Sequence, residues 1–569
     1  MLRSLVGSEM CIRDSFKGHR RKLREGFQRD LGGKYMRPTF LGFETQKRTL
    51  QVAQKNLDIA GNNISNINTV GYTRQRVDLY AMYVSGNRSL RWCSNTNNLS
   101  LTGQGVNAYG VSQTRDQYID KRYRENTAVE AETEKKVNIL SDVEDVLDNI
   151  DTDGLQYYTE QYFKALQDYS VERPDAAEVA TIAVNSATNL CRILNDYSTK
   201  LREVEDTYVS ETKNTVTYVN NLLSEMNQLN KRIAKEKMCY PDEYGPNELY
   251  DQLNMYIDEL ANYGDISVTK HSNGTISVDM AGVNVLNAEK FKTNSLVMQD
   301  YYTNGQVVLN FESGEEVNLH SGVLKAYIDS LNGNGVYATG RQNGEHGIAY
   351  YKSAIDIFAR TLADTFNAAN GADDDPARQM FVGYPSGGKD PTADENKDGV
   401  LDGGYSEVLI TAGNIHVSTV WRENPTMIGM VKSIDPATGE QRYGYDEKVD
   451  SNGNVTLQNT NVLFLLSKFE KGVKFGNEND FKGDIYQYIS FISDRLAEKI
   501  SYETSRNETA KSTVDTLLDA RDEVSGVQMD EEGINMLNYQ KWYSASSRML
   551  TTLDDALDKL INGTGRVGL

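Results

Sequence analysis

The chain has 569 residues, enough for several domains, and its 39% hydrophobic content is ordinary for a globular protein. Its formal net charge of −21 argues against a nucleic-acid partner, because the phosphate backbone of DNA or RNA is also negative. No run of about 18 apolar residues occurs, so the sequence predicts no membrane span.

The first 35 residues differ from the rest of the chain. They carry nine Lys and Arg residues against four acids, and they lack the apolar run of a signal peptide. Residues 4–15 resemble the translation of a sequencing adaptor. We therefore predict that residues 1–35 are a non-native or disordered leader and that the native chain begins at Met36. A disordered basic arm is the alternative.

A heptad pattern follows the leader. Four residues recur every seven positions, namely Phe43, Leu50, Leu57 and Ile64. Each is followed three positions later by a second set, namely Gln46, Ala53, Ala60 and Ile67. This spacing is the a/d seam of a coiled coil. The Asn- and Gly-rich residues 61–76 should end the helix, while Ile64 and Ile67 keep the loop packed.

The middle of the chain changes period several times. Residues 115–237 show helical periodicity with breaks at Gly154 and Pro174, as in a bundle of few, long helices. One apolar stripe in this region comprises Val219, Leu222, Met226, Leu229 and Ile233. From residue 264 the period is two, and Asn273-Gly274 predicts a hairpin turn. Helical spacing returns at residue 351, a Gly- and Asp-rich stretch with short β-like segments occupies residues 371–460, and helix resumes at Val462.

The C-terminal end carries a second apolar stripe. Its members step by three and four, and they are Met536, Tyr539, Tyr543, Ser546, Leu550, Leu553, Leu557 and Leu560. Neither terminal stripe has a partner beside it in the sequence. We therefore expect each to pair with the other or with other copies of the chain, as in polymer-forming proteins.

These patterns predict an α+β multidomain protein with long terminal helices, a helical-bundle body and inserted β domains. The terminal helices (residues 36–76 and 525–569) form a coiled-coil-like inner domain. The mainly helical body comprises residues 77–263, 348–372 and 461–524. Residues 264–347 form a β domain, and residues 373–460 form a variable insert containing β structure.

No motif assembles a nucleophile with a base, so the sequence predicts neither an enzyme nor a bound cofactor. Cysteine pairs at metal-ligand spacing are absent, and isolated cysteines such as Cys191 and Cys239 are expected to act as small hydrophobes. The one weak calcium candidate resembles half of an EF-hand loop, with oxygen ligands at Asp394, Asn396, Asp398 and Asp402. Tyr405 occupies the position of the required bidentate acid, so a polar surface loop is the better interpretation.

The two terminal motifs together resemble those of bacterial flagellar axial proteins, the family of rod, hook and hook-associated proteins. The N-terminal match is Asn62-Asn63-Ile64-Ser65-Asn66, followed by Asn68-Thr69-Val70-Gly71-Tyr72. The C-terminal match runs from Ser525 to Glu532 and continues through residues 538–550. Val70 stands where the family commonly has proline, and cysteine is unusual in the family.

The resemblance implies a structural protein of the extracellular flagellum, exported through the flagellar type III apparatus without a cleaved signal peptide. The chain length favours a protein that joins hook to filament as a ring. The implied partners are other copies of the chain, the hook protein, a second hook-associated junction protein and an export chaperone. The assembly residues are expected to be the two stripes together with Asn62, Asn63, Asn66, Thr69, Gly71 and Tyr72.

Three alternatives remain. The first is that the chain is a hook or distal-rod protein. The second is an enzyme carried in the insert, and the third is adhesion of the β insert to a surface. Because a lone pair of terminal helices buries too little apolar surface to offset its ordering entropy, the termini are also predicted to fold only on assembly.

Overall fold

The computed structural model describes residues 41–81, 105–147, 154–239, 245–372, 375–384, 409–434, 441–449, 454–470, 472–476 and 481–563. The predicted leader, the calcium candidate at Asp394 to Asp402, and Cys11 and Cys93 lie outside these residues. The chain forms two compact units. The larger comprises residues 55–79 and 108–539, and the smaller comprises residues 1–54, 80–107 and 540–569.

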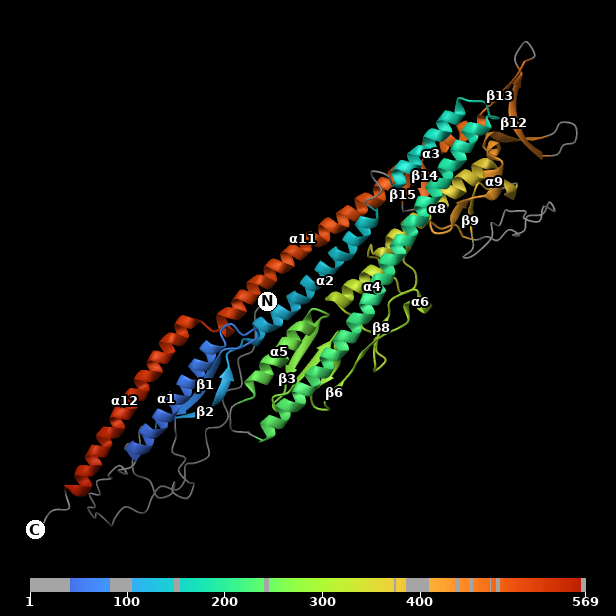
Figure 1. Ribbon diagram of the computed structural model, residues 1–569. Helices are drawn as coiled ribbons and strands as arrows, with labels where there is room; N and C mark the ends of the chain where they lie inside the picture. Colours follow the sequence, from blue (N-terminus) through green and yellow to red (C-terminus); the bar gives the residue numbers. More distant parts are fainter. Residues whose placement is uncertain are drawn as a thin grey trace, which may run out of the picture. The chain divides into compact units, whose positions relative to one another are not determined.

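Long helices dominate the larger unit. The longest are α2 (Gln117–Leu147), α4 (Ala177–Cys239), α8 (Ile348–Asn370) and α11 (Ile485–Ser525). The shorter ones are α3 (Leu155–Ser170), α5 (Asn247–Ala261), α6 (Tyr301–Asn304), α7 (Val323–Asn332), α9 (Thr419–Glu423) and α10 (Thr460–Glu470). Helix α2 packs along α11, and α3 packs along α4 (Figure 1).

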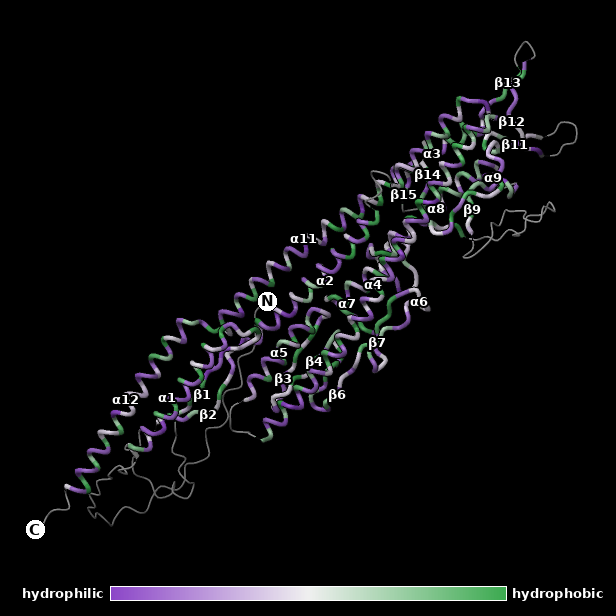
Figure 2. The backbone as a smooth tube through the Cα atoms, viewed as in Figure 1, coloured by the Kyte–Doolittle hydropathy of each residue, from purple (hydrophilic) through white to green (hydrophobic). Residues whose placement is uncertain are grey.

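The predicted stripes explain why these helices pack. All five members of one stripe on α4 are buried, namely Val219, Leu222, Met226, Leu229 and Ile233. The predicted break at Pro174 falls between α3 and α4. Helix α11 begins with a capping box, in which Asp484 Oδ1 accepts a hydrogen bond from the Gln487 amide at 2.7 Å. Figure 2 shows hydrophobic and hydrophilic residues interspersed along every long helix, and no described helix is long and apolar enough to cross a membrane.

The hairpin prediction at Asn273-Gly274 is confirmed. Strands β3 (Ile266–Lys270) and β4 (Ile276–Met280) pair in antiparallel register across this turn, with Val268 opposite Val278. Strands β5 (Val283–Asn287) and β6 (Lys292–Thr293) complete this four-stranded sheet. A separate ladder joins β7 (Leu296–Met298) to β8 (Leu309–Phe311).

The prediction that residues 264–347 are β throughout is wrong in its second half. Helix α7 lies there, followed by a short 3-10 helix at Gly335–Tyr337. Leu324, Tyr327 and Leu331 are buried at helical spacing, and α7 packs against α2 and α4. The preceding alternation of period two hid this short amphipathic segment.

The described part of the predicted insert contains short antiparallel ladders. Their strands are β9 (Phe381–Gly383) with β10 (Ile415–Val417), and β11 (Met430–Ile434) with β12 (Gln441–Val449) and β13 (Val455–Gln458). Two further 3-10 helices lie at Pro376–Arg378 and Pro425–Gly429. The helix predicted from Val462 is α10, but the hairpin of β14 (Val473–Phe475) and β15 (Phe481–Gly483) separates it from α11.

A buried arginine ties this region to the helical body. Arg378 is 2% exposed and donates hydrogen bonds to the backbone carbonyls of Asn370, Met427 and Met430. Its guanidinium also lies 4.6 Å from the centre of the Tyr443 ring. Three carbonyls and an aromatic face therefore take the place of a carboxylate partner.

The terminal segments are helix α1 (Leu41–Ser65), helix α12 (Met529–Asn562), and the paired strands β1 (Gln75–Ala81) and β2 (Val106–Gln113). Each extends from one unit into the other. Within the smaller unit the start of α1 meets α12, because a Cβ placed at Gly42 would lie 3.4 Å from Leu553 Cδ1.

Candidate functional site

The end of α1 is shaped by asparagine side chains. Asn66 Nδ2 donates hydrogen bonds to the Asn62 carbonyl at 3.0 Å and to Asn62 Oδ1 at 2.9 Å. The Thr69 hydroxyl donates to Asn66 Oδ1 at 3.2 Å. Asparagine competes for backbone hydrogen bonds in this way, which ends helices and stabilises turns. The predicted helix end in residues 61–76 is confirmed, with Ser65 as the last helical residue.

Asn63 is the centre of the site and is 1% exposed. Its Oδ1 accepts hydrogen bonds from the Gln75 amide at 3.0 Å and from the Tyr72 hydroxyl at 2.8 Å. Its Nδ2 donates to the Gln75 carbonyl at 2.9 Å and to Glu532 Oε2 at 3.3 Å. All four hydrogen-bonding positions of the amide are therefore used, and only asparagine offers this set at this length.

Gly71 is required by the turn between Asn63 and Gln75. Its φ of +79° lies in the left-handed region, and a Cβ there would come 2.3 Å from Met255 Sδ on α5. The turn brings Tyr72 back over α1. Burial raises the pKa of the Tyr72 hydroxyl, and the carboxylates of Asp251, Glu248 and Glu532 add to the effect, so the group stays a neutral donor.

Arg74 links the N-terminal motif to the start of α12. Its guanidinium contacts Glu532 Oε1 at 2.7 Å and Glu531 Oε2 at 2.8 Å. The Arg74 amide donates to the Ser525 carbonyl at 2.9 Å. Burial by itself would lower the pKa of Arg74, but Glu532 and Glu531 outweigh it and raise the pKa. The same acids lie in the first turn of α12, where the helix dipole favours negative charge.

Six residues therefore join the two motifs, and we name them the terminal clasp: Asn63, Tyr72, Arg74, Gln75, Glu531 and Glu532. The structure places the predicted residues Asn62, Asn63, Asn66, Thr69, Gly71 and Tyr72 in or beside this clasp. Sequence reasoning missed Arg74 and the two glutamates as site residues. The available signal was that each motif carries charge of the sign opposite to the other.

The predicted seam of α12 is its less exposed face. Ser546 is buried, whereas the seam residues Met536, Tyr539, Leu550, Leu553 and Leu557 are half-buried and Tyr543 and Leu560 are exposed. The best-buried face of α1 shares only part of the predicted seam. Its members are Val52, Ala53, Asn56, Ala60 and Asn63, so the seam residues Ala53 and Ala60 are buried, while Phe43, Leu50, Leu57 and Ile64 are half-buried. At Asn63 this face carries the hydrogen bonds of the terminal clasp.

The structure bears on the predicted roles of the cysteines and, separately, on metal binding. Cys191 is buried and Cys239 exposed, both as free thiols, and burial raises the pKa of the Cys191 thiol. Among the described residues no group of three or more His, Cys, Asp or Glu side chains could hold a metal ion.

Asp251 on α5 lies behind the N-terminal motif and is 7% exposed. Gln113 Nε2 donates to its Oδ1 at 2.8 Å. Burial raises the pKa of Asp251 to about 6, although hydrogen bonds from Thr73 and the charge of Arg115 oppose this shift. The carboxylate is thus ionised near neutral pH at a cost in folding free energy.

Asp251→Asn should therefore flatten the pH dependence of stability. An acid whose folded pKa exceeds its unfolded value binds its proton more tightly when folded, so stability falls as pH rises from about 4 through 6. Between pH 4 and pH 7 the variant should gain about 1–3 kcal/mol relative to the unmodified chain, measured by urea unfolding at both pH values. Asp58→Asn, at an exposed position on α1, is the matched control. Parallel pH profiles for the Asp251 variant and the unmodified chain would contradict the prediction.

Comparisons with known proteins match most of the chain. The family model "Flagellar hook-associated protein FlgK helical domain" matches residues 140–381. The model "Flagella basal body rod protein" matches residues 43–73, and "Flagellar basal body rod FlgEFG protein C-terminal" matches residues 519–563. Flagellar hook-associated protein 1 of Bacillus subtilis is 27% identical, with 93% of this chain and 99% of that protein covered. The chain is thus similar to flagellar hook-associated protein 1 along nearly its whole length.

Two other known proteins are also similar to the chain, one in sequence and one in fold. Flagellar hook-associated protein 1 of Salmonella typhimurium is 23% identical over 90% of this chain and 98% of that protein. The structure of the flagellar hook junction protein FlgK from Burkholderia pseudomallei is similar in fold, with a TM-score of 0.51 and 12% identity. The match covers 71% of this chain and all of that chain (100%). In this chain, the segments that match the two rod-type models each contribute residues to the terminal clasp.

Proposed function

We propose that this chain is a structural subunit of the bacterial flagellum that joins the hook to the filament as a ring of copies. The observation that carries the proposal is the relationship along more than nine-tenths of the chain to flagellar hook-associated protein 1. Hook and distal-rod roles are less well supported, because the long helical segment at residues 140–381 matches the hook-associated protein model. The role is structural rather than catalytic.

The terminal helices are proposed to make the ring. Helix α12 leaves several apolar side chains exposed outside the predicted seam: Ile534 at 60%, Leu537 at 56% and Met549 at 50%. Exposed apolar residues along one helix are typical of a protein–protein interface. Copies that pack α1 and α12 side by side would cover both the half-buried seam and this outer surface.

Further partners follow from the same role. We propose that the ring contacts the hook protein on one side and a second hook-associated junction protein on the other. An export chaperone is expected to cover α12 before assembly, because its apolar side chains would otherwise promote aggregation. We also propose that the chain passes through the flagellar type III apparatus to reach the extracellular flagellum.

Immunogold labelling of purified hook–basal bodies with attached filaments tests the location. Antibody against this chain should bind as one narrow band at the boundary between hook and filament. Label spread along the hook, or confined to the rod, would overturn the junction role in favour of another axial position.

Limited proteolysis of the free monomer should cleave the outer ends of α1 and α12 but leave the terminal clasp intact. We expect early cleavage in α12 after about residue 540 and in α1 before about residue 55, because these segments belong to the smaller unit. Residues 55–79 and 529–539 should resist, since the clasp holds them to the larger unit. Mass spectrometry of the fragments locates the cuts. Protection of both ends in the monomer would contradict folding on assembly.

A further inference from the structure

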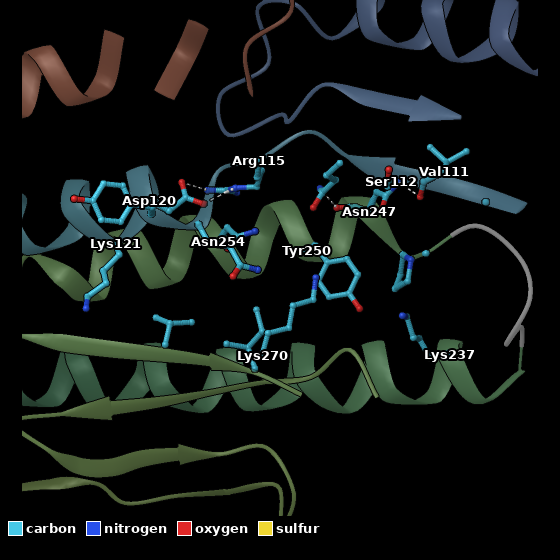
Figure 3. A pocket seen from close by; sticks show the side chains of 18 of the residues that line it. Val111, Ser112, Arg115, Asp120, Lys121, Lys237, Asn247, Tyr250, Asn254 and Lys270 are labelled. Atoms are coloured by element: carbon cyan, nitrogen blue, oxygen red, sulfur yellow. Dashed lines mark hydrogen bonds and ion pairs between the residues drawn. The ribbon is translucent and has the colours of Figure 1, made fainter. Parts of the chain in front are cut away.

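The larger unit contains a cavity of about 900 Å³ that the flagellar role does not use. It lies between β2, the start of α2, the end of α4, helix α5 and the β3–β4 hairpin. Figure 3 shows the phenol of Tyr250 in its middle, with Lys270 and Lys237 on either side. A volume of several hundred Å³ or more is typical of small-molecule sites.

The cavity is basic in a strongly acidic protein. Five basic side chains line it, namely Arg115, Lys121, Arg124, Lys237 and Lys270. The lining acids are Asp78, Asp120 and Glu236. Two arginines are already neutralised, because Arg115 pairs with Asp120 at 2.9 Å and Arg124 pairs with Asp258 at 2.6 Å.

Lys237 and Lys270 are not neutralised in this way. Neither lysine has a carboxylate within ion-pair distance among the described residues. Lys270 Nζ lies 4.9 Å from the centre of the Tyr250 ring. Burial lowers the pKa of Lys270, and the positive charges of Lys237 and Arg115 lower it further. The two ammonium groups thus repel each other, and an anion bound between them would relieve the repulsion.

Tyr250 supplies a second, independent sign of a ligand. The residue is 6% exposed, and its hydroxyl is buried with no hydrogen-bond partner in the described part of the chain. A Cβ placed at Gly274 would lie 2.2 Å from this hydroxyl and 3.1 Å from Lys237 Cε. The hydroxyl therefore packs against the Gly274 turn, next to the aliphatic stem of Lys237, which also lines the cavity. An unsatisfied buried donor is costly, and a bound acceptor would remove that cost.

We propose that this cavity is an oxyanion-binding site in which Lys237, Lys270 and the Tyr250 hydroxyl hold a carboxylate or phosphate group. Two ammonium groups supply charge, and the phenol donates one directed hydrogen bond. A free small anion or an acidic side chain from a second copy of the chain could provide this chemistry.

Calorimetric titration of the full chain with inorganic phosphate and with citrate tests the site at low ionic strength. Saturable binding is expected, and Lys237→Gln with Lys270→Gln should weaken it at least tenfold. The control pair Lys231→Gln with Lys235→Gln removes the same charge from exposed positions on α4 and should change affinity less than twofold. Tyr250→Phe should weaken binding about threefold to tenfold while leaving the melting temperature unchanged or higher, because the lost hydroxyl has no partner to lose.

Sedimentation velocity of the same variants separates the two sources of the oxyanion. Saturable binding of phosphate or citrate identifies a free anion. A concentration-dependent self-association that is lost in the Lys237 and Lys270 double variant, but kept in the control pair, identifies an acidic side chain of a second copy. The proposal is overturned if neither anion binds and self-association is equal in all variants.

Discussion

Glu532→Gln should loosen the start of α12 from the rest of the molecule. The Glu532 side chain is 4% exposed and contacts both Arg74 and Asn63 in the terminal clasp. Glutamine keeps the shape but removes the charge, so the partly buried Arg74 loses its principal partner. Breaking a buried ion pair from one side costs several kcal/mol, and because Arg74 keeps some solvent contact we expect about 2–4 kcal/mol. Hydrogen–deuterium exchange of the amides in residues 529–539 measures this loss locally.

The neighbouring glutamate provides a control in the same clasp. Glu531 contacts the same guanidinium at 2.8 Å, but its side chain is 52% exposed. Exposed ion pairs contribute little, so Glu531→Gln should change the opening free energy by less than about 1 kcal/mol. Equal effects of the two substitutions would show that burial does not set the strength of the clasp, contrary to our interpretation. In the flagellum, we expect only the Glu532 variant to lower the number of attached filaments.

Leu553→Asp should abolish filament attachment while the chain is still secreted. Leu553 is half-buried in the monomer, where it lies against Gly42 at the start of α1. In the proposed ring, neighbouring helices would bury it fully, and an unpaired carboxylate there costs several kcal/mol in every subunit. The monomer itself should lose only about 1–2 kcal/mol, because its carboxylate keeps access to water. Swimming motility and electron microscopy of hooks measure the outcome.

Ser544→Asp is the matched control for this substitution. It adds the same charge to an exposed position of α12, half a turn around the helix from Leu553 at about 100° per residue. Motility should persist in this variant. Normal swimming with Leu553→Asp would contradict the seam, and loss of swimming with both variants would mean that α12 tolerates no added charge on either face.

Periodicity predicted those parts of the fold in which a regular apolar pattern marks the buried face. The α4 stripe from Val219 to Ile233 is buried as expected, and a hairpin forms at Asn273-Gly274 as expected. Both signals are local, so the sequence contains all the information they require. The short helix α7 escaped because its ten residues follow directly on a period-two region.

Only part of the terminal clasp could be predicted from the sequence, because its contacts join segments that are far apart along the chain. The asparagines and Gly71 came from a recognisable motif, but their partners could not be inferred. A buried pair such as Arg74 with Glu532 joins positions 458 residues apart and leaves no periodic trace. The heptad stripe on α1 likewise reports which residues are apolar, whereas the polar residues Asn56 and Asn63 are also buried on that helix.

The long span of the clasp has a consequence for the order of folding. Contacts of large sequence separation form late, because the intervening chain must be restricted first. Asn63 and Arg74 cannot meet Glu531 and Glu532 until nearly the entire polypeptide has been made and released. The clasp can therefore close only in a chain that includes its final helix. A chain interrupted before that helix would leave Asn63 and Arg74 without their acidic partners, and its two ends would not be joined for packing against other copies in the proposed ring.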